Sequence, residues 1–144
     1  MKVLYVLGPN LGRLGEREPH LYGSQTLAEI ELEVTERATR LGHAVTWRQS
    51  DDETDVVAWI RGAAAEGFDA VIANPGALTH YASAVGEAAA ACAVPLVEVH
   101  MTNIYAREPF RHASVVSPHA AAVIVGAGAG VYHLALEALP WTTR

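Results

Sequence analysis

Residues 96–111 read LVEVHMTNIYAREPFR, and this stretch is the best guide to how the chain folds. It follows Pro95 and opens with a short β-branched, apolar run, which is typical of a strand buried on both faces. Glu98 and His100 are set into that run. Because strand side chains alternate between faces, these two point the same way, about 7 Å apart at the backbone. We therefore expect the carboxylate to hold the imidazole in one orientation and one tautomer.

A polar loop follows this strand and carries Arg107 and Arg111. Burying a carboxylate and an imidazole is costly unless each has a partner. An acid, a titratable ring and two permanent cations after a buried strand therefore predict a site for an anionic substrate. The alternative is a core strand whose polar side chains only satisfy one another.

Similar apolar runs occur elsewhere in the chain, and amphipathic or Ala-rich segments separate them. Two capping-box sequences, residues 26–29 and 50–53, are expected to begin helices. Strands that alternate with helices and are apolar on both faces predict a single α/β domain over residues 1–144, with a flavodoxin-like, doubly wound, five-stranded parallel sheet. The expected strands are 3–7, 45–47, 70–73, 96–100 and 123–125, and the expected helices are 26–41, 50–67, the Ala-rich segment up to about 92, and 131–139.

Composition and charge narrow the class of partner. The 144 residues are 51% hydrophobic and 18% charged, with a formal net charge of −6 and no basic run, so we expect neither nucleic acid nor an anionic membrane as a partner. The single cysteine, Cys92, excludes an internal disulfide and a cysteine-cluster metal site. The first apolar run ends at Gly8, too early for a signal peptide, so a cytoplasmic enzyme or binding protein is expected.

Polar residues follow three of the expected strands, at residues 8–10, 74–80 and 100–111. Ligands of doubly wound sheets bind at the carboxyl ends of the strands, near the topological switch point, so the three segments are expected to converge on one site. Residues 11–24 have neither a helical nor a strand period and contain several glycines. We expect a mobile lid there, with a flexible surface excursion as the alternative.

Several kinds of chemistry find little support in the sequence. No Gly-x-Ser-x-Gly motif is present, and Cys92 falls within an expected helix. The glycines of residues 126–130 lack the spacing of a dinucleotide-binding loop, so we interpret them as points of close packing between helix and sheet. A metal held by His80, Glu98 and His100 is formally possible. Glu98 is more simply interpreted as the partner of His100, and no metal is expected.

Proton transfer is the chemistry that the remaining residues favour. Tyr22 lies five residues after Arg17 in the expected lid. A nearby guanidinium favours the phenolate, so Tyr22 would be a general base, with His100 a general acid on the opposite side. Together they would eliminate water from a small hydroxylated acid. Candidates to hold a water or hydroxyls are Asn10 and Asn74, and candidates to hold a carboxylate are the amides of Met101 and Thr102 with the Thr102 hydroxyl.

Three segments of the chain resemble the type II 3-dehydroquinate dehydratases. They are residues 7–23, LGPNLGRLGEREPHLYG; residues 74–80, NPGALTH; and residues 98–111, EVHMTNIYAREPFR. Their order and spacing match the family over nearly the whole chain. The resemblance implies a flavodoxin-like fold and reversible anti elimination of water from 3-dehydroquinate to 3-dehydroshikimate, through an enolate, in the shikimate pathway to aromatic amino acids. It also implies that no metal or organic cofactor is used and that the chains form a dodecamer of trimers.

The resemblance assigns a role to each candidate residue. Tyr22 would be the base and Arg17 its activator, with Arg13 on the same lid. His100 would be the acid, oriented by Glu98. The remaining groups would be Asn10 for the water that stabilises the enolate, Asn74, His80 and Arg111 for the ring hydroxyls, Met101 and Thr102 for the carboxylate, and Arg107 as a supporting charge.

The sequence also departs from the family pattern. Where the family usually has Thr-Ser and then Arg-Asp, this chain has Tyr81-Ala82 and Gly86-Glu87, and Val115 replaces a tyrosine. The family's aspartate reaches into a neighbouring subunit's site, and Glu87 keeps its charge. Tyr81 and Gly86 favour a second hypothesis, a homologue that uses the same base and acid on another cyclic or carbonyl substrate in a specialised pathway. A non-catalytic binding protein is the third. Two further departures are Leu7 for asparagine and Thr102 for serine.

Overall fold

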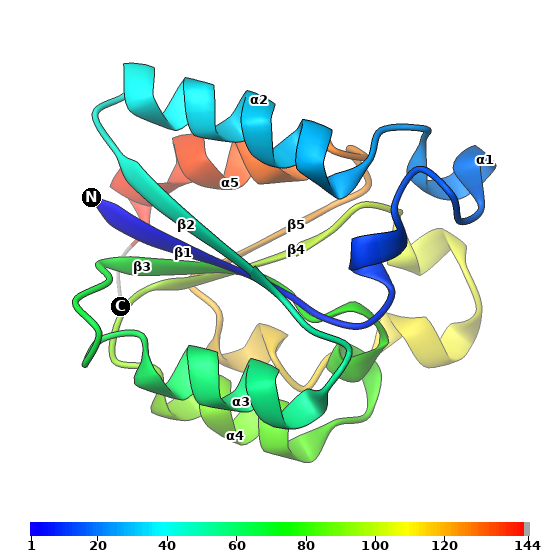
Figure 1. Cartoon of the computed structure of the whole chain (residues 1–144). Helices are drawn as coiled ribbons and strands as arrows, with labels where there is room; N and C mark the ends of the chain where they lie inside the picture. The colour runs from blue at the N-terminus through cyan, green and yellow to red at the C-terminus, as the bar shows by residue number, and fades with distance from the viewer. Residues whose placement is uncertain (143–144) are drawn as a thin grey trace.

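The computed structural model describes residues 1–142, which form a five-stranded parallel sheet in the order β2-β1-β3-β4-β5 with helices on both faces (Figure 1). The order reverses between β1 and β3, so the topological switch point lies between these two strands. The prediction of one flavodoxin-like α/β fold is confirmed. The strands are β1 Lys2–Leu7, β2 Ala44–Gln49, β3 Ala70–Asn74, β4 Leu96–His100 and β5 Ala122–Val125.

Four longer helices cover the sheet. Figure 1 shows α2 and α5 on one face and α3 and α4 on the other. Among the described residues, no helix is both long enough and apolar enough to cross a membrane. The helices are α2 Leu27–Arg40, α3 Glu53–Gly62, α4 Ser83–Ala91 and α5 Gly130–Ala138, with a one-turn helix, α1 Pro19–Tyr22, before them.

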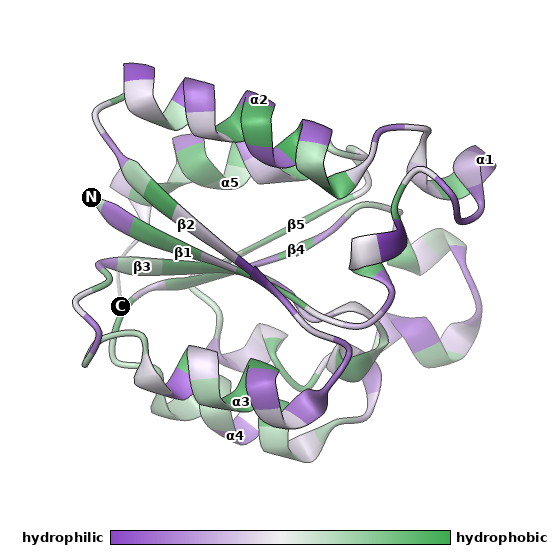
Figure 2. Ribbon diagram, in the orientation of Figure 1, coloured by the Kyte–Doolittle hydropathy of each residue, from purple (hydrophilic) through white to green (hydrophobic). Residues whose placement is uncertain are grey.

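The strands read as apolar runs because both of their faces are buried. In β1, Val3 and Tyr5 pack in the core under α2 and α5, while Leu4 and Val6 pack in the core over α3 and α4. All four are fully buried. Figure 2 shows the same distribution, with hydrophobic residues along the strands and polar ones on the outer faces of the helices. Two separate cores therefore fix the central strands that end at the site.

The first predicted capping box begins a helix, and the second does not. Thr26 Oγ1 accepts the Glu29 N–H at 3.2 Å and begins α2. At the second, the expected start at Ser50 is wrong, because Asp52 is the N-cap and its carboxylate accepts the Thr54 N–H at 2.8 Å. The Ser50 hydroxyl instead accepts the N–H of Asp52. The helix α3 therefore begins later than expected, and it also ends earlier, at Gly62.

The segment 11–24 is more ordered than its sequence suggests. It contains a short 3-10 helix, η1 Leu11–Arg13, and the one-turn helix α1. Leu11 and Leu14 are buried in the core under α2, which anchors the first part of the segment. The expectation of a stretch without regular structure was wrong, because two leucines found apolar partners and Pro19 suits the first position of a helix. Motion of this segment as a lid stays a prediction.

Candidate active site

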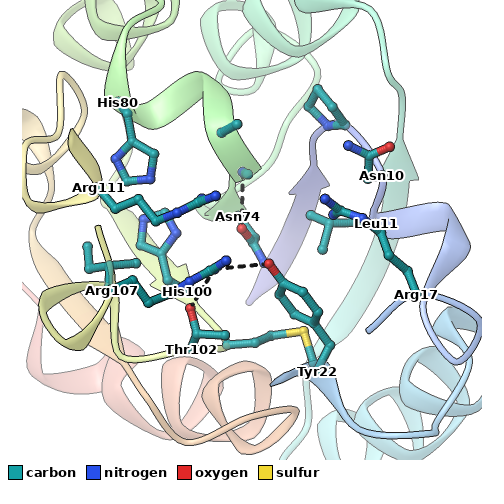
Figure 3. A pocket seen from close by; sticks show the side chains of 15 residues that line it. Asn10, Leu11, Arg17, Tyr22, Asn74, His80, His100, Thr102, Arg107 and Arg111 are labelled. Carbon is teal, nitrogen blue, oxygen red and sulfur yellow. Dashed lines mark hydrogen bonds between the residues drawn. The ribbon is translucent and has the colours of Figure 1, made fainter. Parts of the chain in front are cut away.

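A pocket opens at the carboxyl ends of β1, β3 and β4, where the sequence predicted a site (Figure 3). Arg17 and Tyr22 of the segment 11–24 complete its wall. The predicted site residues that line this pocket are Asn10, Arg17, Tyr22, Asn74, His80, His100, Met101, Thr102, Arg107 and Arg111.

Three predicted residues lie outside the lining of the pocket. Arg13 is exposed on η1, and Glu87 is exposed on α4. Glu98 is fully buried and lies behind His100. Glu98 can therefore act only through the imidazole, and Glu87 does not line its own chain's pocket.

A close backbone approach joins the loops after β1 and β3. A Cβ atom at Gly8 would lie 2.3 Å from the carbonyl oxygen of Pro75, so no other residue fits there without a backbone shift. The Gly8 N–H also donates to the Asn74 carbonyl at 2.9 Å. These contacts bring Asn10 and Asn74 to the same pocket at the switch point of the sheet.

Asn74 is held by hydrogen bonds that its sequence motif does not reveal. Its Oδ1 accepts the Gly76 N–H at 3.1 Å, and its Nδ2 donates to the hydroxyl of Tyr132 at 2.9 Å. Tyr132 lies in α5 and is fully buried, and burial raises the pKa of its phenol, so the hydroxyl stays neutral. The sequence does not mark Tyr132 as part of the site, because a tyrosine on the apolar face of a helix is typical of a core residue.

Glu98 and His100 form the pair that strand alternation predicted. His100 Nε2 donates to Glu98 Oε2 at 2.6 Å, and only 5% of His100 is exposed. Since an ionised carboxylate can only accept, Nε2 carries a hydrogen and Nδ1 is left as the nitrogen available for proton transfer. The imidazole is therefore fixed in one tautomer when neutral.

Three hydroxyl groups also donate to the Glu98 carboxylate. They belong to Thr79, at 2.7 Å, Ser114, at 3.0 Å, and Ser117. Burial alone raises the pKa of Glu98, but the hydrogen bond and charge of His100, together with the hydrogen bonds from Ser117 and Thr79, outweigh it and hold that pKa below its usual range. Nothing in the sequence marks Ser114 and Ser117 as part of the site, because they lie in a loop outside β4 and meet Glu98 only in the folded chain.

The Tyr22 hydroxyl contacts Arg107, which was expected to be only a supporting charge. Arg107 Nη1 donates to the Tyr22 hydroxyl at 3.0 Å and to Thr102 Oγ1 at 3.2 Å. The expected activator, Arg17, lies against the ring, with Cζ 5.8 Å from its centroid. Figure 3 shows the hydroxyl turned into the pocket toward Arg107. The hydrogen bond to the phenolic oxygen is thus made by Arg107.

The pocket is strongly cationic although the chain is anionic overall. Figure 3 shows the guanidiniums of Arg17, Arg107 and Arg111 reaching into it, and the residues that line it include no aspartate or glutamate. Arg111 is partly balanced by exposed Glu108, with Nε 2.8 Å from Oε2. This arrangement favours a small anion.

His80 presents an acceptor to the pocket. Its Nδ1 lies 2.8 Å from the carbonyl oxygen of Ala113, so Nδ1 carries the hydrogen and Nε2 has a free lone pair. Burial lowers the pKa of His80, and the charge of Arg111 lowers it further. Within residues 1–142, no group of three His, Cys, Asp or Glu side chains is placed to hold a metal ion.

The glycines of residues 126–130 do not have the packing role that the sequence suggested. Gly126 and Gly128 have φ angles of 94° and 56°, and their N–H groups donate to the carbonyls of His100 and Met101 at 3.1 and 2.9 Å. Only Gly adopts such angles readily. These glycines form the turn that fixes the end of β4, and they are not points of close packing between helix and sheet.

The fold and the site together define a flavodoxin-like α/β protein that sets a phenol and an anchored imidazole in a cationic pocket. A protein-family model described as dehydroquinase class II matches residues 1–140. The chain belongs to this family.

Individual relatives agree with that assignment. A 3-dehydroquinate dehydratase from Anoxybacillus flavithermus is 47% identical over 139 residues, which cover 96% of this chain and 93% of the relative. The crystal structure of the type II dehydroquinase from Propionibacterium acnes is similar with a TM-score of 0.91 at 43% identity, covering 94% of this chain and 93% of that one. That of the type II dehydroquinase from Butyrivibrio crossotus has a TM-score of 0.94 at 36% identity, covering 97% of each chain.

Proposed function

We propose that this chain is a type II 3-dehydroquinate dehydratase, a hydro-lyase that converts 3-dehydroquinate to 3-dehydroshikimate and water. One observation carries the proposal beyond family membership: Tyr22 and His100 line the same cationic pocket. The substrate is a small hydroxylated carboxylate, which suits three guanidiniums and several neutral hydrogen-bonding groups. We place the reaction in the cytoplasm and in the route to aromatic amino acids.

The elimination takes place in two proton transfers. The Tyr22 phenolate removes a proton from the carbon beside the ketone, and the C–H electron pair moves into an enolate. A water held by Asn10 stabilises the enolate oxygen. The enolate then collapses, the C–O bond breaks, and protonated His100 delivers its Nδ1 proton to the departing hydroxyl. Each step is assigned to a side chain of this protein.

The phenolate depends on its cationic surroundings. Arg107 donates a hydrogen bond to the phenolic oxygen, and Arg17 lies against the ring. Both guanidiniums favour the charged form of the base. On the acid side, Glu98 stabilises the imidazolium and keeps Nε2 engaged, so that the transferred proton is the one on Nδ1.

The remaining lining residues are proposed to bind the substrate. The carboxylate would accept hydrogen bonds from the Met101 and Thr102 amides. The ring hydroxyls would meet the free Nε2 of His80 and the other binding groups, Asn74 and Arg111. Two departures from the family, Tyr81 and Gly86, lie outside the pocket lining, and Tyr81 is 68% exposed. They leave room for the family's substrate.

The assembly is part of the proposal. Glu87 is exposed on α4 and does not line its own chain's pocket, which suits a carboxylate that reaches the site of a neighbouring copy. A dodecamer built from trimers would bring the two together. Light scattering on the purified protein measures this directly, and a monomer would contradict it.

A spectrophotometric assay tests the activity. Purified protein is mixed with 3-dehydroquinate, and the absorbance of the conjugated enone product is followed. We expect turnover that falls by about 10²- to 10⁴-fold in Tyr22→Phe, since a general base is lost. An intact, folded protein with no turnover would contradict the proposal and favour a different cyclic or carbonyl substrate.

A further inference from the structure

The Glu98 carboxylate accepts hydrogen bonds from a loop that has no other part in the proposed mechanism. Two of its hydroxyl donors, Ser114 and Ser117, lie between residues 113 and 117, a segment we call the serine loop. The third donor, Thr79, lies in the connection between β3 and α4. Within residues 1–142, every buried side-chain oxygen and nitrogen has a hydrogen-bond partner, and this includes the carboxylate oxygens of Glu98.

The serine loop is held tightly on its inner side. The Val115 N–H donates to the carbonyl of Thr79 at 2.8 Å. The N–H groups of Val116 and Ser117 both donate to Ser114 Oγ at 3.0 Å, which turns the single hydroxyl hydrogen of Ser114 toward Glu98. The Val116 side chain is fully buried in the core over α3 and α4.

The serine loop packs against Gly86 in α4. A Cβ atom at Gly86 would lie 2.8 Å from the carbonyl oxygen of Val115 and 3.0 Å from its Cβ. The first contact is with backbone, so the loop as a whole would have to move. Glycine is disfavoured in the middle of a helix, and this close approach explains why one is present in α4.

We infer that Gly86 is a positioning residue for the acid. By lacking a side chain it admits the Val115 carbonyl against α4 and thereby seats the hydroxyls of Ser114 and Ser117 on the Glu98 carboxylate. Its kinetic consequence rests on the proposed function, whereas its effect on Glu98 does not.

A methyl group at position 86 moves the serine loop outward. The Ser114 and Ser117 donors then lengthen or break, and the carboxylate loses part of what keeps it ionised. The other titratable groups near Glu98 are His100, which binds it, and His80, which lies farther off and is itself influenced by the charge of Arg111. Of these groups, His80 is the one hydrogen-bonded to the serine loop, through the carbonyl of Ala113.

The test compares Gly86→Ala with Ser114→Ala and with a control, Gly62→Ala. Gly62 is a helical glycine in α3 whose added Cβ would meet nothing closer than 3.8 Å. Folding is checked by circular dichroism. The Glu98 carboxyl carbon is then titrated by 13C NMR, and kcat and KM for 3-dehydroquinate are measured across pH.

We expect Gly86→Ala and Ser114→Ala to raise the pKa of Glu98 in the same direction and to shift the acid limb of the kcat profile to higher pH. The loss in kcat should be about tenfold, the scale of one hydrogen bond to a charged group, with KM changed much less. Gly62→Ala should match the unaltered protein in every measurement.

Two results would overturn the inference. One is a folded Gly86→Ala protein whose Glu98 titration and kcat match those of Gly62→Ala. If Gly86→Ala does not fold, the double variant Ser114→Ala/Ser117→Ala decides, and an unchanged Glu98 titration there overturns it equally. If the unaltered protein does not turn over 3-dehydroquinate, the proposed function fails, but the NMR titration still decides the role of Gly86.

Discussion

At the scale of single residues, the hydroxyl of Tyr22 depends on Arg107. The Arg107 side chain donates to this oxygen at 3.0 Å. We expect Arg107→Gln to lower kcat for 3-dehydroquinate by about 10- to 100-fold, because the change removes a charge-assisted hydrogen bond and a positive charge from the base. Steady-state kinetics measures the effect. Arg61→Gln, on the exposed side of α3, is the control for loss of an arginine. An Arg107→Gln enzyme as active as this control would return the role to Arg17.

Tyr132 sets the orientation of Asn74 from inside the core. Its hydroxyl accepts the Asn74 Nδ2 hydrogen at 2.9 Å, and the phenol is fully buried. Tyr132→Phe should raise KM several-fold and lower the free energy of unfolding by about 1–3 kcal/mol, because a buried amide is left with one partner fewer. Kinetics and denaturant unfolding measure the two effects. Tyr105→Phe, at a tyrosine that is 57% exposed, serves as control, and a Tyr132→Phe protein equal to it in KM would exclude this role.

The contact within the site that the sequence predicted has a property that the other contacts lack. Glu98 and His100 could be paired because two residues on one strand have a fixed geometry. Ser114, Ser117 and Tyr132 could not, since each meets its partner only after distant parts of the chain have packed. A serine in a loop or a tyrosine on an apolar helix face is common, and nothing local marks it as part of a site.

At the scale of the elements, β4 is a strand buried on both faces that carries a carboxylate. The pKa of Glu98 is held below its ordinary value of 4.5, so its ionised form stabilises the folded state. That stabilisation is complete above about pH 4.5 and is lost as the pH falls through the lower, folded-state pKa. We therefore expect the free energy of unfolding to fall more steeply between about pH 5 and pH 3 in the unaltered protein than in Glu98→Gln.

Denaturant unfolding at a series of pH values measures this slope. Glu36→Gln is the matched control, because Glu36 is an exposed glutamate on α2. It should keep the pH dependence of the unaltered protein. Parallel curves for the unaltered protein and Glu98→Gln would show that the carboxylate contributes no pH-dependent stability to β4.

The elements themselves followed from the sequence where hydrophobic periodicity was long. All five strands and the four longer helices were expected, and α2 begins at its predicted cap. The errors lie where short polar residues compete. Asp52 is the N-cap that Ser50 was expected to be, and two buried leucines order a segment whose glycines suggested that it was irregular. Such competition is decided by tertiary contacts, which a local pattern does not contain.

At the scale of the whole molecule, charge and topology act together. A chain with a net charge of −6 gathers three guanidiniums at one edge of its sheet. Alternating strands and helices predicted that edge, because doubly wound sheets bind ligands at the carboxyl ends of their strands. The role proposed for Glu87 does not follow from one chain's topology, since it would be played in a neighbouring copy.

Mixed assemblies test whether Glu87 acts in a neighbouring subunit. Tyr22→Phe and Glu87→Gln chains are each expected to have low activity alone. In trimers assembled from equal amounts of the two chains, about a quarter of the sites combine an intact Tyr22 from one chain with an intact Glu87 from its neighbour. Refolding or co-expressing the two variants together should therefore restore activity well above the sum of the separate variants.

The same experiment separates the two possible geometries. If Glu87 served the site of its own chain, no chain in the mixture would hold both residues, and mixing would restore nothing. A mixture of Tyr22→Phe with His100→Ala is the negative control, because both side chains line one pocket of one chain and cannot complement each other. Restored activity in the first mixture together with none in the second would show that each active site is completed by a second copy of the chain.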